Sequence, residues 1–225
     1  MNRQAFLESL GPLTQSQREG FEALLTAGEK LPREHMAYVL ATAFHETSGL
    51  MQPIKETVMP WHQNKNPSDK EVISRLDRAF AAGKLPQVNV PYWRGGWFGR
   101  GYVQITHQQN YHQVGKVIGI DLLSDPNRAL HPNVAARILI DGMSLGLFTG
   151  KKLSDYLPAD FVNARRIVNG TDRATEIAER ALRYDVALKA AGYGHQQAKE
   201  PAKEPASGGI WAAIFAAIMS IFRRK

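Results

Sequence analysis

Two glutamates ten residues apart, Glu46 and Glu56, are the residues of this sequence best suited to acid–base chemistry. Glu46 ends an apolar, helix-like segment, so we expect it on a rigid element. Val39, Ala43 and Phe44 precede it, and apolar surroundings disfavour a charged carboxylate. We therefore expect Glu46 to hold a proton, as a general acid must when it protonates a glycosidic oxygen.

The position of Glu56, after a turn at Pro53, could place a second carboxylate across a groove from Glu46. A separation of roughly 6.5–9.5 Å would favour an inverting hydrolysis, and about 5–5.5 Å a retaining one. The sequence does not supply this distance. Two exposed surface glutamates are the alternative interpretation, because most glutamates are exposed.

The dipeptide His45-Glu46 raises the question of a metal site. In the zinc motif H-E-x-x-H a second histidine follows four residues after the first, and Gly49 occupies that place here. No other histidine has helical spacing to His45. We therefore expect neither a metal nor a cofactor.

The segment 95–111, GGWFGRGYVQITHQQNY, combines glycines with aromatic and hydrogen-bonding side chains. Glycines allow the backbone to pass close to a ligand, and flat aromatic faces beside amides and hydroxyls suit a sugar ring. A glycine-rich turn with ordinary core aromatics is the alternative. The segment is not a phosphate loop, because the Lys-Ser/Thr ending is absent.

Three blocks, HETSG (45–49), FGRGYVQITHQQNY (98–111) and RIVNG (166–170), occur in the order of a known family. Together they resemble the family 19 glycoside hydrolases, which comprise chitinases and the related lysozyme-like endolysins of phages. The resemblance runs from about residue 30 to 192. It implies a mainly α, lysozyme-like helical domain with little sheet.

The resemblance implies three catalytic residues. Glu46 matches the catalytic acid, and Thr106 stands where members use Ser or Thr to hold the attacking water. Glu56 is our choice for the second carboxylate, with Asp69 and Glu71 in reserve. The implied mechanism is a single displacement with inversion.

The remaining candidates would line the sugar-binding cleft. Asn169 belongs to the late N-G motif, and Arg180 is aligned with a late arginine that contacts the acid–base network. The expected substrate-binding residues are His45, Trp97, Tyr102, Gln104, Asn110, Asn169 and Arg180.

Helix signals predict the elements that position these residues. Thr14 with Gln17, and Ser68 with Glu71, have the spacing of capping boxes, and Pro32 suits the first turn of a helix ending near Glu46. Residues 83–101 lack periodicity and are expected to form a long loop or short strands. Helical patterns resume near residue 108, after residue 132, and between residues 173 and 191. Residues 1–193 are expected to form one catalytic domain.

The C-terminal part of the chain has a different composition. Residues 194–209 are rich in Lys, Glu, Pro, Ala and Gly, as in a linker. Residues 210–225 have an amphipathic helical pattern, and thirteen apolar-rich residues would span roughly 20 Å, short of the ~30 Å of a bilayer core. We expect a cationic helix that contacts a membrane surface. Its contacting residues would be Trp211, Phe215, Phe222, Arg223, Arg224 and Lys225. Docking on the catalytic domain and self-association are the alternatives.

The composition of the chain limits the partners and the location that we expect for the protein. The chain has 28 Lys and Arg against 21 Asp and Glu, a formal charge of +7, and no cysteine. A positive surface favours polyanions such as anionic wall polymers, but the basic residues are scattered and match no nucleic-acid-binding module. The N-terminus lacks a signal-peptide pattern, so we expect residence in the host cytoplasm until lysis releases the enzyme to the cell wall.

These features favour a monomeric endolysin that hydrolyses the β-1,4 bonds between N-acetylmuramic acid and N-acetylglucosamine in peptidoglycan. Two alternatives stay open. One is a chitinase, because chitin shares the linkage and the N-acetylglucosamine unit. The other is a membrane-permeabilising protein whose glycan-binding domain has no catalytic activity.

Overall fold

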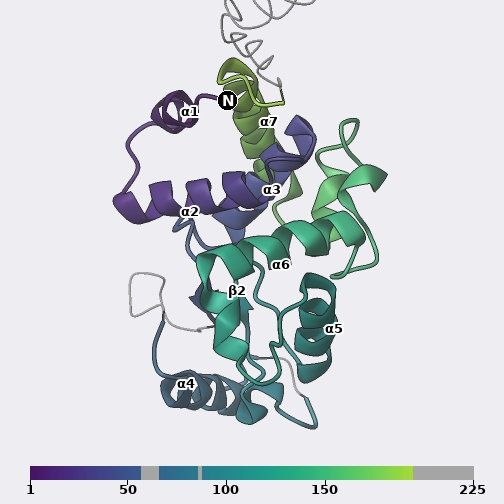
Figure 1. Cartoon of the computed structure of the whole chain (residues 1–225). Helices are drawn as coiled ribbons and strands as arrows, with labels where there is room; N and C mark the ends of the chain where they lie inside the picture. Colours follow the sequence, from purple (N-terminus) through teal and green to yellow (C-terminus); the bar gives the residue numbers. More distant parts are fainter. Residues whose placement is uncertain (57–65, 86–87, 195–225) are drawn as a thin grey trace, which may run out of the picture. The chain divides into compact units, whose positions relative to one another are not determined.

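The computed structural model of the chain describes residues 1–56, 66–85 and 88–194 (Figure 1). These residues form seven α-helices, four 3-10 helices and one two-stranded sheet, which confirms the prediction of a mainly α fold with little sheet. In chain order they are α1 (Arg3–Ser9), α2 (Gln15–Ala27), α3 (Arg33–Glu46), β1 (Ile54–Lys55), α4 (Asp69–Ala81), η1 (Tyr92–Gly95), β2 (Arg100–Gly101), α5 (Gln108–Ile118), η2 (Pro126–Leu130), α6 (Pro132–Leu145), η3 (Leu153–Asp155), η4 (Asn163–Ile167) and α7 (Ala174–Ala190).

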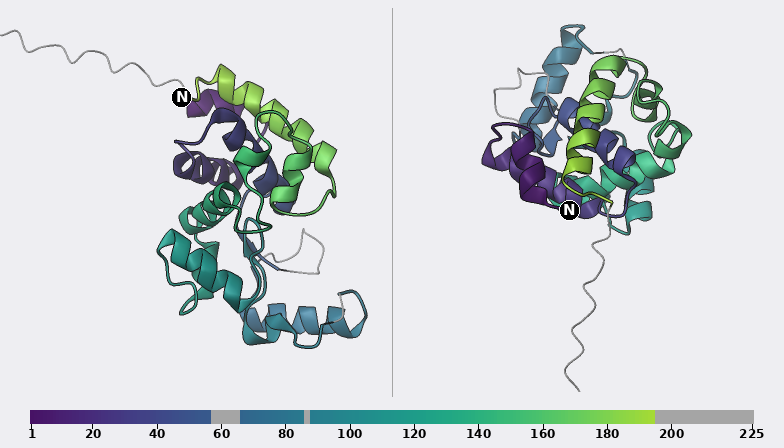
Figure 2. Two further views of the ribbon diagram at one scale, coloured as in Figure 1. Left: turned by 90° about the vertical axis from the view of Figure 1, so that its right-hand side faces the viewer. Right: turned by 90° about the horizontal axis from the view of Figure 1, so that it is seen from above.

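Residues Asn2–Gly194 form one compact unit. The predicted linker from residue 195 onward and the predicted C-terminal helix lie outside the described residues, and both stay predictions. Within the unit, α4 lies at the opposite end from α1 and α7, as Figures 1 and 2 show.

Helix α3 is the central helix of the unit. Every residue from Met36 to Ala43 is buried, as expected for a helix surrounded by packed neighbours. It packs along α7 over most of its length and also contacts α2 and α6 (Figure 2). Glu46, its last residue, is therefore held at the end of a rigid element.

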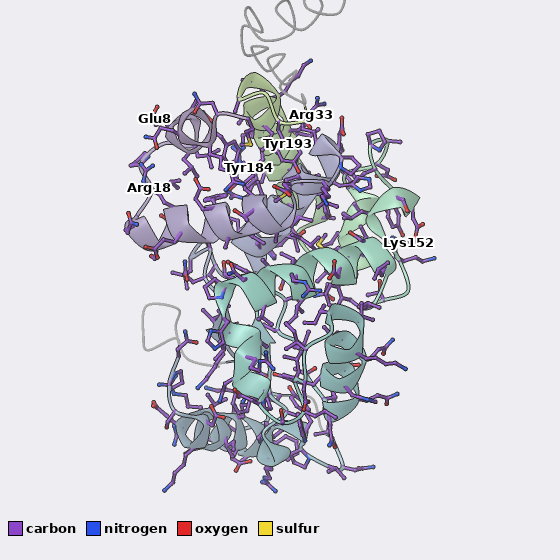
Figure 3. The ribbon with its side chains drawn as sticks, in the orientation of Figure 1. Glu8, Arg18, Arg33, Lys152, Tyr184 and Tyr193 are labelled. Atoms are coloured by element: carbon purple, nitrogen blue, oxygen red, sulfur yellow. The ribbon has the colours of Figure 1, made fainter. Side chains whose placement is uncertain are left out.

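Helix α7 is fixed by contacts on two sides. The ring of Tyr184 packs edge-on against Phe6 and Phe21, with centroids 6.5 and 5.8 Å away. Arg33, at the start of α3, forms an ion pair with Asp185 at 2.7 Å (Figure 3). These contacts fix α7 beside the helix that ends in Glu46.

The helix starts follow the sequence signals. Thr14 and Gln17 form the reciprocal capping box before α2. Ser68 caps α4 by accepting from the Glu71 amide at 3.3 Å, but the Glu71 side chain pairs with Arg75 one turn later. The start of α4 thus has half of the expected box.

The sheet joins two segments far apart in the sequence. Strands β1 and β2 are antiparallel, with Ile54 opposite Gly101 and Lys55 opposite Arg100. Apart from residues 86 and 87, which the structure does not describe, residues 83–101 otherwise form only η1 and connecting turns, in agreement with the predicted loop with short elements. The sheet brings the segment after Glu46 against the glycine-rich segment.

Gly20 on α2 allows the chain between the two glutamates to pass close by. A Cβ atom there would lie 1.6 Å from the carbonyl oxygen of Met51, so no side chain fits. Gln17 of the same helix donates to the Gly49 carbonyl at 2.8 Å. Helix α2 thus fixes the path of residues 49–51, which lead from Glu46 towards Glu56.

Candidate active site

Glu46 leaves the end of α3 in a fixed direction because the following turn is tightly bonded. Thr47, fully buried, donates to the Ala43 carbonyl at 2.7 Å and accepts from the Met51 amide at 3.0 Å. The Gly49 amide then donates to the Phe44 carbonyl at 2.7 Å, with Gly49 in the left-handed region. A glycine suits this left-handed position just after the end of a helix.

The partner of Glu46 is a buried arginine. Nη1 of Arg165, on η4, donates to Oε1 of Glu46 at 2.5 Å. The Arg165 side chain is 3% exposed and that of Glu46 is 19% exposed. Nε of Arg165 donates to the Asp172 carbonyl at 3.1 Å, which fixes the guanidinium plane.

This pair corrects the expectation of apolar surroundings. We expected Val39, Ala43 and Phe44 to shield a neutral Glu46, but a guanidinium contacts its carboxylate instead. The helix periodicity gave no sign of the arginine because it comes from a segment more than a hundred residues later.

Arg180 lies beside the end of α3, and its predicted role stays a prediction. We aligned it with the arginine of the acid–base network, and its guanidinium lies over the Phe44 ring, 4.0 Å from the centroid. The guanidinium that contacts Glu46 is that of Arg165. Arg180 supports the end of α3 by packing on an aromatic face.

Glu56 is held at both carboxylate oxygens by neutral donors. Oε2 accepts from the Gly99 amide at 2.8 Å, and Oε1 accepts from the Tyr92 hydroxyl at 2.9 Å. The Glu56 amide in turn donates to the Gly99 carbonyl at 2.7 Å. The carboxylate therefore has a fixed orientation just beyond the sheet.

Gly99 is required for this arrangement. A Cβ atom at this position would lie 2.8 Å from the side-chain oxygen of Gln104 and 3.3 Å from Cβ of Glu56. The absence of a side chain lets the Glu56 carboxylate fold back onto the Gly99 amide.

The two reserve candidates for the base, Asp69 and Glu71, form ion pairs with other side chains. Asp69 forms ion pairs with Lys55 at 2.8 Å and with Arg100 at 3.0 Å. Burial by itself raises the pKa of Asp69, but the hydrogen bond from Lys55 and the charge of Arg100 outweigh it and lower the pKa. Glu71 pairs with Arg75 on the surface of α4. Among the three candidates for the base, Glu56 alone is held by neutral donors.

Arg100 holds the glycine-rich segment in place. Its guanidinium is 1% exposed and donates to Asn127, the Gly96 carbonyl and the Tyr111 hydroxyl, at 2.9, 2.8 and 3.0 Å. It also lies over the Phe98 ring, 3.7 Å from the centroid. These bonds fix the backbone on both sides of Gly99.

A cavity of about 190 Å³ is lined in part by the glycine-rich segment. It contains three of the predicted cleft residues: Gln104 and Thr106, which are half-buried, and Asn110, which is exposed. Its lining is completed from the ends of α6 and η4. The full lining is Val103, Gln104, Ile105, Thr106, Asn110, Gln113, Val114, Leu147, Phe148 and Val168.

The backbone beside this cavity is strained at two positions. Gln104 and His107 have positive φ values of 56° and 65° without being glycine. The side-chain amide of Gln104 donates through Nε2 to the carbonyls of Ile54 and Gly101, at 2.8 and 3.0 Å. These bonds stabilise the unusual backbone conformation of Gln104. Such strain is frequent at functional sites.

Of the two aromatic residues predicted to bind the sugar, Trp97 and Tyr102, only Trp97 is accessible to solvent. Trp97 is partly exposed and packs beside Tyr111, with ring centroids 5.5 Å apart, so its face can meet a ligand. Tyr102 is fully buried, which corrects the expectation that it contacts a sugar. Composition alone could not separate the core aromatic from the exposed one.

The remaining predicted residues flank Glu46. His45 is half-buried and lies near Glu176 of α7. Asn169 is exposed, and its backbone amide donates to the Arg165 carbonyl at 3.0 Å. Its side-chain oxygen accepts from the next amide, that of Gly170, at 2.8 Å.

The structure thus forms two clusters around the candidate catalytic groups. Glu46, Arg165 and Asn169 come from α3 and the η4 segment, whereas Glu56 and Gln104 come from the sheet region. The cavity lining includes Gln104 of the second cluster and Val168, the residue before Asn169, but neither glutamate. Within the described ranges, no hydrogen bond joins Glu46 to Glu56.

Two residues of these clusters escaped the sequence analysis, Arg165 and Tyr92. The buried neighbours Ala164 and Ile167 show that η4 presents Arg165 inward, whereas Arg166 is exposed. This short apolar pattern was the available signal for Arg165. Nothing in the sequence near Tyr92 indicated contact with a glutamate thirty-six residues earlier.

The predicted membrane-contacting residues, Trp211, Phe215, Phe222, Arg223, Arg224 and Lys225, lie outside the described residues. In the described part of the chain, no helix is both long enough and apolar enough to cross a membrane.

Comparison with known proteins identifies the class of enzyme. The model of the family described as chitinase class I, glycoside hydrolase family 19, matches residues 14–138, more than half of the chain. The chain belongs to this family and is therefore a glycoside hydrolase, which confirms the resemblance. The matched range contains Glu46, Glu56 and Thr106, but neither Arg165 nor Asn169.

Two solved structures of chitinases match this chain. Chitinase C from Streptomyces griseus matches with a TM-score of 0.52 and 20% identity, over 86% of this chain and 78% of that one. A class IV family 19 chitinase from Zea mays matches with a TM-score of 0.47 and 19% identity, over 85% and 92%. The first of these likenesses supports the lysozyme-like helical fold.

Proposed function

We propose that this chain is a phage-type endolysin that hydrolyses the β-1,4 bonds between N-acetylmuramic acid and N-acetylglucosamine in peptidoglycan. The observation that supports it most is the contrast between its two glutamates. Glu46 is bound through one oxygen by a cation, whereas Glu56 accepts hydrogen bonds from two neutral groups. Paired carboxylates in different environments are typical of an acid and a base acting together.

Glu46 is the general acid in this proposal. Arg165 binds Oε1, so Oε2 is the oxygen that delivers the proton to the bridging oxygen of the glycan. As the proton leaves, negative charge develops on Glu46, and the fixed guanidinium stabilises it. Preorganised charge of this kind lowers the barrier because nothing must reorient during the reaction.

Glu56 and Thr106 act on the attacking water. Glu56, whose carboxylate accepts a hydrogen bond from the Gly99 amide, takes the proton from the water. The hydroxyl of Thr106, beside Gln104 and Asn110 in the cavity lining, positions that water. Attack opposite the leaving group gives inversion.

The choice of peptidoglycan rests on charge. The chain has a net charge of +7, which suits an anionic wall, and its C-terminal segment suits a bacterial membrane surface. The second candidate is chitin, favoured by the description of the matched family and by the names of the similar structures. Mass spectrometry of products from purified peptidoglycan, beside reducing-sugar release from chitin, separates the two.

Replacing Glu46 by glutamine tests the acid. Glu46→Gln keeps the shape but cannot deliver a proton, so clearing of chloroform-treated Gram-negative cells should fall at least about a hundredfold. Glu34→Gln, at the start of the same helix, removes a half-buried carboxylate that pairs with Arg33; it is the matched control and should retain activity. Unchanged clearing by Glu46→Gln would refute the assignment.

The C-terminal segment and the location of the enzyme complete the proposal. Residues 210–225 dock on anionic membrane through an apolar face and the basic end Arg223, Arg224 and Lys225. The enzyme is made in the host cytoplasm, works as a monomer and reaches the wall at lysis.

A further inference from the structure

Tyr92 completes the set of donors around Glu56. Its hydroxyl donates to Oε1 of Glu56 at 2.9 Å, while the Gly99 amide binds Oε2. The two donors come from different segments, η1 and the residue before β2. The Glu56 carboxylate therefore cannot rotate without breaking one of these bonds.

The Tyr92 ring is itself held on two sides. Its centroid lies 5.1 Å from that of Trp93, edge-on, and 4.4 Å from that of His107. Trp93 is buried and donates to Asp77 of α4 at 2.9 Å, which attaches η1 to that helix. The hydroxyl is thus fixed by packing before it meets Glu56.

Tyr92 also remains a donor over the working pH range. Burial is the largest cause that raises the pKa of its hydroxyl, followed by the charge of Glu56 and the hydrogen bond to it. A phenol with a raised pKa keeps its proton at neutral and mildly alkaline pH.

We propose that Tyr92 is a positioning residue for the hydrolysis, whose hydroxyl orients the Glu56 carboxylate towards the attacking water. This inference rests on the proposed role of Glu56 as the base. Tyr92 acts only through Glu56 and is not proposed to contact substrate.

The expected signature is a change in pH dependence. A hydrogen bond donated to a carboxylate stabilises its ionised form, so loss of the bond moves the acidic limb of the kcat/KM profile to higher pH. The other titratable and charged groups near Glu56 remain in a Tyr92 variant, so the shift reports the lost hydroxyl. They are Lys55 and Arg100 on the sheet, Asp69 on α4, and His107 and Tyr111 at α5.

Tyr92→Phe removes the hydroxyl and keeps the ring. On whichever of purified peptidoglycan or glycol chitin the wild type cleaves faster, we expect kcat to fall about tenfold at neutral pH. The acidic limb of kcat/KM should move up by about one pH unit, which corresponds to a tenfold effect on the ionisation equilibrium. KM should change less than about twofold, because Tyr92 is not proposed to contact substrate. Circular dichroism and thermal unfolding establish that the variant is folded.

Tyr193→Phe is the matched control. The Tyr193 hydroxyl donates to the Gly28 carbonyl at 2.5 Å, among the helices that hold α7, so its removal should lower Tm without moving the pH profile (Figure 3). A folded Tyr92→Phe enzyme with the wild-type profile and kcat overturns the inference. The same holds if Tyr92→Phe lowers Tm and shifts nothing else, as Tyr193→Phe does.

Glu56→Gln separates this inference from the proposed function. If Glu56→Gln is inactive and Tyr92→Phe leaves the profile unchanged, Glu56 acts without Tyr92 and only the present inference fails. If Glu56→Gln retains full activity, the proposed base is wrong, and the role of Tyr92 fails with it.

Discussion

At the scale of single residues, the site depends on how each glutamate is bound. Arg165 is the largest departure from what the helix pattern implied, because it places a buried positive charge against the acid. A guanidinium binds through a planar fork, and this one uses Nη1 for Glu46 and Nε for the Asp172 carbonyl. Removing it leaves a partly buried carboxylate and a backbone carbonyl without their donor.

We expect Arg165→Gln to lower the free energy of unfolding by about 1–3 kcal/mol, the range for losing hydrogen bonds to a charged group. Activity should fall about tenfold or more, because charge developing on Glu46 is no longer stabilised. Urea unfolding and glycan hydrolysis measure the two effects. Arg166→Gln, the exposed neighbour, should stay within about 0.5 kcal/mol of the wild type. Equal behaviour of the two variants would contradict this role.

At the scale of elements, the first residue of α4 connects the helix to both strands. Asp69 binds Lys55 of β1 and Arg100 of β2, which lie opposite each other in the sheet. Glu56 follows Lys55 and Gly99 precedes Arg100, so this bridge lies next to the candidate base. Helix α4 therefore stabilises the part of the sheet from which Glu56 extends.

Asp69 predicts a pH dependence of stability. Its folded-state pKa is lowered, so its contribution is present above the unfolded-state value of about 4 and is lost as the pH falls through the lower folded value. At pH 6, Asp69→Asn should cost about 1–2 kcal/mol, because two largely buried cations lose their carboxylate. The difference from the wild type should shrink at pH 3.

Urea unfolding at both pH values measures this difference. Glu71→Gln is the control on the same helix, since its carboxylate, which pairs with the buried Arg75, is 45% exposed and should contribute under about 1 kcal/mol. A cost of Asp69→Asn that is equal at pH 6 and pH 3 would show that the bridge is not electrostatic.

At the scale of the whole molecule, the compact unit Asn2–Gly194 contains all the residues of the proposed hydrolysis. The proposed membrane contact belongs to residues 210–225 alone. Glycan cleavage and access to the envelope should therefore depend on different parts of the chain.

Deleting residues 208–225 should leave hydrolysis of isolated sacculi within about twofold of the full chain, while lysis of intact cells added from outside should fall about tenfold or more. The apolar face and basic end supply the membrane affinity that the deletion removes. Turbidity clearing of both substrates measures this. A collapse of sacculus hydrolysis together with Tm would instead show that the segment is structural.

The sequence by itself determined the features that local chemistry encodes. Apolar periodicity and capping residues such as Thr14 and Ser68 predicted the helices, and the absence of periodicity predicted the irregular segment before Arg100. The blocks around Glu46 and Thr106 were specific enough to indicate the family, because glycines and polar groups at fixed spacing are rarely coincidental.

Only the tertiary structure decided which side chains meet. Arg165 reaches Glu46 across 119 residues, and Tyr92 reaches Glu56 across 36, through packing that no local pattern encodes. The burial of Tyr102 and the exposure of Trp97 likewise depend on neighbours from distant segments. Periodicity records which face of a segment is apolar, whereas the environment of a carboxylate depends on the segments that the fold brings against it.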